Sequence, residues 1–114
     1  AEYQRNVPPH VRAARLAGAE PRSFPDTEQT FDELLARIDT AKSYIRSFAA
    51  ADINDSEERQ ITLKTGGREC TFRGQDFLCH FVLPNIFFHC TTAYNILREA
   101  GAALGKADFI GPQP

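Results

Sequence analysis

The chain lacks several features that would settle its class at once. Its three cysteines, Cys70, Cys79 and Cys90, are odd in number and lie nine and eleven positions apart, which fits neither a disulfide framework nor a zinc knuckle. No basic run is present and the formal net charge is -2, which argues against nucleic acid and anionic membranes as partners. The cysteine pattern predicts reduced, largely buried thiols in a cytoplasmic protein.

Long apolar runs are lacking too. The most apolar stretch, residues 77–90, is interrupted by two histidines, a proline and an asparagine, and it is too short to cross a bilayer. The first residues do not resemble a secretory leader, in which a charged segment precedes an apolar one. What is present is ordinary globular usage, with 42% hydrophobic and 25% charged residues in 114 positions, and this predicts one domain with one modest core.

Apolar periodicity predicts two helices in the first half. Pro8 and Pro9 suit the first turn of a short helix that Gly18 ends. Apolar residues then recur at steps of three and four over residues 31–48, so a long amphipathic helix should run to about residue 50 and pack one face. We place its N-cap at Asp26 or Thr27, and we expect the acidic residues 52–58 to form a loop.

The second half predicts a hairpin followed by helix. Residues 61–64 and 70–73 alternate in polarity around Gly66-Gly67, as in a two-stranded ribbon. A helical pattern resumes at Gln75, and Pro84 should kink or break it. The last helix should cover residues 86–100 and end at Gly101, after which the apolar residues of the tail 104–111 dock back on the bundle.

Chemistry-bearing residues gather in the run from Pro84 to Arg98. Asn85 and His89 lie four positions apart and so share one helical face. Such a pair inside an apolar helix is a degraded metal site, a substrate-orienting pair, or a buried hydrogen bond, and the sequence leaves all three open. The candidate ligand-binding residues are Asn85, Phe88, His89, Thr92 and Tyr94, and His89 is also the candidate catalytic acid or base.

Other reactive residues have simpler interpretations. Asp76 and His80 also lie one turn apart. The core-facing side of this helix is occupied by Phe77, Leu78 and Phe81, so we expect Asp76 and His80 to form a pair on the solvent side. No fixed cation stands near the cysteines in the sequence, which favours packing over a nucleophilic role.

Several of these motifs together resemble a known family. They are the hairpin at residues 61–68, the helix start Gly74-Gln75-Asp76, the run 84–98, and the closing segments 104–106 and 108–111. In these the chain is similar to the uncharacterised family catalogued as domain of unknown function number nineteen-ninety-three, in the DinB-like superfamily. Residues 15–18 and 31–40 look like the family too, so the resemblance covers about nine tenths of the chain.

This resemblance implies a mainly α fold, a four-helix up-down bundle with a small inserted β-hairpin. Family members are longer at the N-terminus, and only three of the four helices have counterparts here, the last one kinked at Pro84. An apolar stripe would then be left exposed. We expect a second copy, as in a homodimer, or a further N-terminal segment to cover that stripe.

The resemblance also bears on metal and function. In the wider superfamily a divalent ion such as zinc or nickel is commonly held by three histidines, and alignment places Asn85 and His89 on two of those positions, with His10 the only candidate for the third. Asparagine is a poor ligand for these ions. We therefore expect a protein that binds a small apolar or aromatic molecule near Asn85 and His89. The alternatives are a metal-dependent or histidine-assisted transferase, hydrolase or isomerase-like enzyme, and a structural or dimerisation module.

Overall fold

Two prolines begin the first helix. In the computed structural model, which describes residues 8–112, α1 (Pro9–Leu16) has Pro8 as its N-cap and Pro9 in its first turn, where no backbone N–H is needed. Gly18, with a φ of 71°, adopts the left-handed conformation that ends the helix. Both features agree with the sequence-based prediction.

The long helix α2 (Phe31–Arg46) begins later than predicted. Its N-cap is Thr30, whose Oγ1 accepts a hydrogen bond from the Glu33 backbone N–H at 3.3 Å, while Glu33 Oε2 accepts one from the Thr30 N–H at 2.9 Å. This reciprocal capping box satisfies two N–H groups at the helix start. The predicted cap at Asp26 or Thr27 is wrong, and Asp26 instead pairs with Arg37 at 2.8 Å.

The connection after α2 is also more helical than predicted. The chain leaves α2 at Arg46 and turns into a short helix, α3 (Ala50–Asn54). The Asp52 carboxylate accepts a hydrogen bond from the Ala49 N–H at 3.2 Å, which caps this turn. The predicted loop over residues 52–58 is therefore wrong for its first three residues.

The hairpin is confirmed. Strands β1 (Gln60–Thr65) and β2 (Arg68–Arg73) pair antiparallel, with Ile61 opposite Phe72 and Leu63 opposite Cys70. Both residues of the Gly66-Gly67 turn have positive φ, as a tight turn matching the strand twist requires. A two-stranded ribbon is not stable alone, so one of its faces has to pack against helices.

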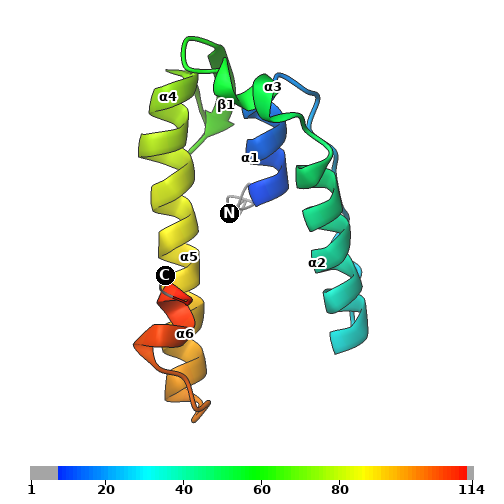
Figure 1. The fold of residues 1–114 in the computed structure, drawn as a ribbon, viewed down its shortest axis with the longest axis vertical. Coiled ribbons are helices and arrows are strands. Elements are labelled where there is room, and N and C mark those ends of the chain that lie inside the picture. Colours follow the sequence, from blue (N-terminus) through cyan, green and yellow to red (C-terminus); the bar gives the residue numbers. More distant parts are fainter. Residues whose placement is uncertain (1–7, 113–114) are drawn as a thin grey trace.

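One long helical rod follows the hairpin (Figure 1). It comprises α4 (Gly74–Asp76), a π-helical turn η1 (Phe77–Val82) and α5 (Leu83–Glu99). Pro84 has no N–H to donate and its ring crowds the carbonyl four residues earlier, and a widened turn just before it relieves that conflict. The irregularity predicted at Pro84 thus lies in η1, and the helix continues through the proline without a break.

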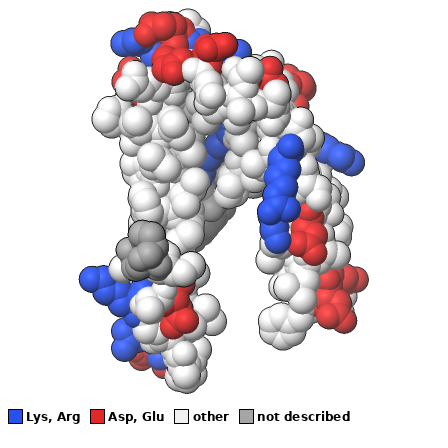
Figure 2. Space-filling view, viewed as in Figure 1, with Lys and Arg blue, Asp and Glu red and all other residues white. Residues whose placement is uncertain are grey.

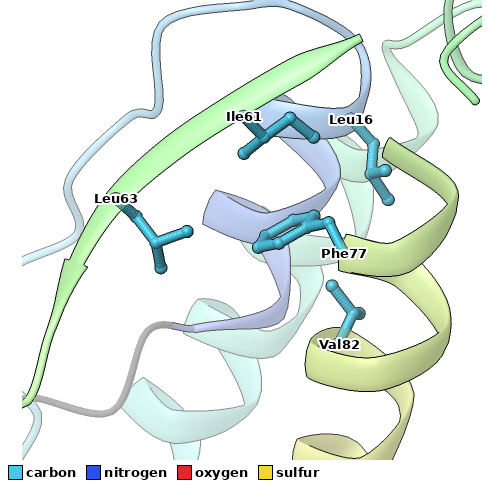
Figure 3. Packing of buried hydrophobic residues seen from close by; sticks show 5 residues of the cluster. All are labelled: Leu16, Ile61, Leu63, Phe77 and Val82. Carbon is cyan, nitrogen blue, oxygen red and sulfur yellow. The ribbon is translucent and has the colours of Figure 1, made fainter. Parts of the chain in front are cut away.

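The core is small and lies where α1, the hairpin and η1 meet. Phe77 is its centre, surrounded by Leu16 from α1, Ile61 and Leu63 from β1, and Val82 (Figure 3). Arg12 of α1 is also buried, and its guanidinium lies 5.7 Å from the centre of the Phe81 ring. This junction is what fixes the directions of the helices that leave it.

Two arms extend away from the core with an open gap between them (Figure 2). One arm is α2 and the other is α5, against which α6 (Lys106–Ile110) folds back (Figure 1). Gly101, with a φ of 88°, ends α5, and the Phe109 ring then meets the Tyr94 ring at 5.6 Å. The docking predicted for the tail is confirmed. None of the helices within residues 8–112 has the length and apolarity to traverse a lipid bilayer.

Candidate functional site

The candidate site lies on an uncovered face of α5. Asn85, Phe88, His89, Thr92 and Ile96 recur at steps of three and four, so their side chains share this face, which we call the α5 face. Phe88 is 66% exposed and Ile96 is 63% exposed. His89 is exposed and Asn85 is half-buried. The face is apolar enough to bury, and no described element buries it.

Asn85 and His89 do not bond to each other. Asn85 Nδ2 donates to the Phe81 carbonyl oxygen at 2.6 Å, which satisfies an acceptor at the end of the π-helical turn. The His89 ring meets the Phe88 ring edge-on at 5.2 Å and makes no hydrogen bond with a described residue. The apolar setting of His89 in the sequence predicts a ring turned into the interior, and this prediction is wrong: no described element packs on this face, and the ring is exposed.

The remaining predicted ligand-binding residues separate into two groups. Thr92 Oγ1 donates to the Phe88 carbonyl oxygen at 2.7 Å, the usual bond of a threonine to its own preceding turn. Tyr94 lies on another side of the helix, where its hydroxyl accepts a hydrogen bond from Arg98 Nη1 at 3.2 Å and its ring packs on Phe109. Tyr94 therefore supports α6 and is not beside His89.

His10 belongs to a different part of the structure. Its ring is 2% exposed and packs against Phe24 at 4.3 Å and Tyr44 at 6.1 Å, between α1 and α2. Among residues 8–112 no three His, Cys, Asp or Glu side chains come together as a metal site. The three-histidine arrangement that the resemblance suggested, with His10 and His89 as ligands, thus finds no counterpart in the described residues.

The buried His10 ring lies at the contact between α1 and α2. Its Nε2 is buried with no hydrogen-bond partner among the described residues. Burial lowers the pKa of His10, a hydrogen bond with the Arg22 backbone opposes that shift, and the Arg37 charge adds to it. The Tyr44 ring packs on this ring and the Arg37 charge acts on it, and no acidic group of the described residues contributes to its pKa, so a proton on His10 gains no counter-charge from them.

We therefore predict that acidification weakens the fold. The unfolded chain binds a proton at His10 more readily, so the free energy of unfolding should fall as the pH drops below the ordinary histidine pKa of about 6.5, and should be insensitive to His10 above it. Urea unfolding between pH 7.5 and 5 measures this. His10→Phe should flatten the curve, while replacement of the exposed His80 by glutamine should not. Parallel curves for wild type and His10→Phe would contradict the prediction.

The cysteines are less buried than expected. All three are free, as predicted, but Cys79 and Cys90 are exposed and Cys70 is half-buried, so the expectation of largely buried thiols is wrong for two of them. Cys79 of η1 and Cys90 of α5 lie on helix faces that no described element covers. Asp76 and His80 form no ion pair with each other in the part of the chain that the structure describes, and His80 is exposed, as expected for a solvent-side residue.

Two features at α2 were not predicted from the sequence, namely a pocket beside the helix and the exposure of its apolar stripe. A shallow pocket of about 330 Å³ lies between α2 and the preceding segment, lined by Phe24, Pro25, Glu28 and Arg37 among others. Arg37 is fully engaged there, because its guanidinium donates to Glu28, to Asp26 and to the carbonyls of Phe24 and Pro25. The hydrogen bond from Arg37 lowers the pKa of Glu28. Together these hydrogen bonds hold the segment before α2 against the helix, so the residues around the pocket serve to join the two.

The second feature is an apolar α2 face made of Phe31, Leu34, Leu35 and Ile38, all exposed. The periodicity identified these residues as one stripe, and we expected the helix to pack on it. Instead α2 is anchored from another side, by Tyr44, whose ring packs against His10 of α1 at 6.1 Å and against Phe24 at 6.0 Å. Its apolar stripe is left uncovered, as is the α5 face.

Comparison with known structures places this arrangement in a class. The chain is similar to the crystal structure of a DinB family member protein from Shewanella denitrificans, with a TM-score of 0.77 and 34% identity over 92% of this chain. The fold is thus that of a DinB-like helical bundle with an inserted hairpin. The match covers 60% of the Shewanella chain, so this chain spans less than two thirds of that structure's length.

The particular family follows from a second comparison. The model of the domain of unknown function DUF1993 matches residues 9–110. The chain belongs to the DUF1993 family, as its hairpin and its last helix suggested. A search of curated proteins gave no match.

Proposed function

We propose that this DinB-like chain binds a small aromatic molecule with a polar tip on the α5 face. The observation that carries the proposal is the exposed imidazole of His89, which makes no hydrogen bond with a described residue and lies beside exposed Phe88. A face that combines an aromatic surface with a few polar groups is typical of small-molecule sites. Asn85 adds its amide oxygen one turn away, since only its nitrogen is engaged.

The chemistry of the ligand follows from these groups. A ring stacked on Phe88 gains apolar contact, and a hydroxyl on that ring can bond to an imidazole nitrogen of His89 or to Asn85 Oδ1. A role for His89 as general base is the alternative from the enzyme class. It requires a substrate held at the same place, so binding is the step to test first.

A pair of matched probes tests the proposal. We expect 1-naphthol to bind more tightly than naphthalene, by about tenfold, which corresponds to the roughly 1.4 kcal/mol of one hydrogen bond. His89→Phe combined with Asn85→Leu removes both hydrogen-bonding groups, and this double variant should lose that preference and keep the binding of naphthalene. Thr91→Val, on the same helix but away from the α5 face, should change neither affinity. Fluorescence titration supplies the affinities, and equal binding of the two probes by the wild type would refute the proposed site.

A further inference from the structure

One group of aromatic rings joins α1 to α2. The His10 ring of α1 packs against Phe24 at 4.3 Å and against Tyr44 at 6.1 Å, and these two rings also meet edge-on at 6.0 Å. We call these three residues the α1–α2 ring cluster. The Tyr44 hydroxyl accepts a hydrogen bond from the Arg22 N–H and donates one to the Glu20 carbonyl oxygen, both at 3.3 Å. The cluster therefore holds α2 and the segment before it against α1.

The core is built from other side chains. α1 lies between α2 and the rod that begins at α4 (Figure 1), and Leu16 packs in the core with Ile61 and Phe77. Within residues 8–112 no ring contact links the α1–α2 ring cluster to the rings of the core. A charge introduced into the cluster therefore does not touch the core.

A proton has no stabilising partner in this cluster. The His10 ring is almost fully buried, and its Nε2 has no hydrogen-bond partner among the described residues. The titratable groups of α2 that act on the ring or pack against it are Arg37 and Tyr44. In the segment between the helices, Arg22 bonds to His10 through its backbone, and its guanidinium lies 5.5 Å from the centre of the Phe24 ring. An imidazolium here would therefore be buried beside cations.

We propose that protonation of His10 releases α2 from α1 while the hairpin and η1 stay folded. Acid then weakens one contact of the fold first, because the imidazolium is hydrated only when the rings of Phe24 and Tyr44 move away from it. In the released form His10 has the ordinary histidine pKa of about 6.5. At pH 5 the released form is then favoured by up to about thirtyfold relative to neutral pH.

Amide hydrogen exchange, read by mass spectrometry on peptic peptides, tests the proposal. After correction for the intrinsic exchange rate at each pH, we expect α2 peptides to lose protection by about ten- to thirtyfold between pH 7.5 and pH 5. Peptides from β1 and η1 should keep their protection. His10→Phe keeps a ring in the cluster without a titrating nitrogen, so its α2 protection should not change with pH. The matched control is His80→Gln, which removes an exposed histidine outside the cluster and should respond as the wild type does.

Three results would overturn the proposal. The first is an equal loss of protection in α2 and in β1 at pH 5, which would mean that the whole fold opens together. The second is an α2 whose protection is absent at pH 7.5 or does not depend on pH. The third is a pH response that persists in His10→Phe. Circular dichroism at pH 7.5 shows whether that variant folds, and His10→Leu replaces it if it does not.

Discussion

Replacing Phe77 with alanine should lower the free energy of unfolding by about 3 to 5 kcal/mol, the usual loss when a large buried aromatic side chain is removed. Phe77 is fully buried, and its ring packs on Phe72 at 5.9 Å and on Phe81 at 5.3 Å. It also joins three elements, because Leu16 of α1 and Ile61 of β1 contact it in the same cluster (Figure 3). Because the buried cluster among the described residues is small, few other side chains can compensate for the loss of this ring.

Urea unfolding measures the loss, and Phe87→Ala is the matched control. Phe87 lies on the same rod but is 58% exposed and outside the core and the α5 face, so its replacement should change stability by no more than about 0.5 kcal/mol. An alanine variant at position 77 that is already unfolded in water would agree with the prediction. Equal losses for the two variants would show that Phe77 is not the centre of the core.

The elements that the sequence predicted well are those fixed by local chemistry. The hairpin follows from alternation around two glycines that both take positive φ. The ends of α1 and α5 follow from Gly18 and Gly101, each in the left-handed conformation. In all three cases the residues that decide the structure are neighbours in sequence, so no knowledge of the tertiary fold was needed.

Errors arose where two local signals competed. Asp26 and Thr30 both suit a helix N-cap, and Thr30 prevails because Glu33 completes its capping box. Asp26 is held elsewhere by Arg37, eleven residues away. This long-range ion pair has no signature in the sequence, so the start of α2 could not be placed from the pattern alone.

The candidate site shows a different limit of sequence reasoning. Spacing correctly put Asn85 and His89 on one face, because helical geometry fixes which residues share a side. It could not show whether another element covers that face, since burial depends on what packs there. The same holds for the α2 face, where the apolar stripe was evident and its exposure was not.

Gly74→Ala should destabilise the fold by about 3 kcal/mol, because the structure has no room for one more carbon atom there. A Cβ on Gly74 would lie 1.8 Å from the backbone oxygen of Ser56, and backbone cannot move aside as a flexible side chain can. Next to it, the Gln75 N–H donates to the Glu57 carbonyl oxygen at 3.1 Å. These contacts fix the start of α4 against the segment before β1.

Because α4, η1 and α5 form one rod, a shift at Gly74 would also displace Phe77 from the core and α5 from its direction. Gly105→Ala is the matched control, since its Cβ would meet nothing closer than Asp108 Oδ2 at 3.8 Å, an ordinary contact, and the expected loss is about 1 kcal/mol or less. Thermal and urea unfolding of both variants measure the difference. If the Gly74→Ala protein were as stable as the Gly105→Ala protein, the backbone at Ser56 would have to move aside at little cost. Gly74 would then not set the direction of the rod that carries the candidate site.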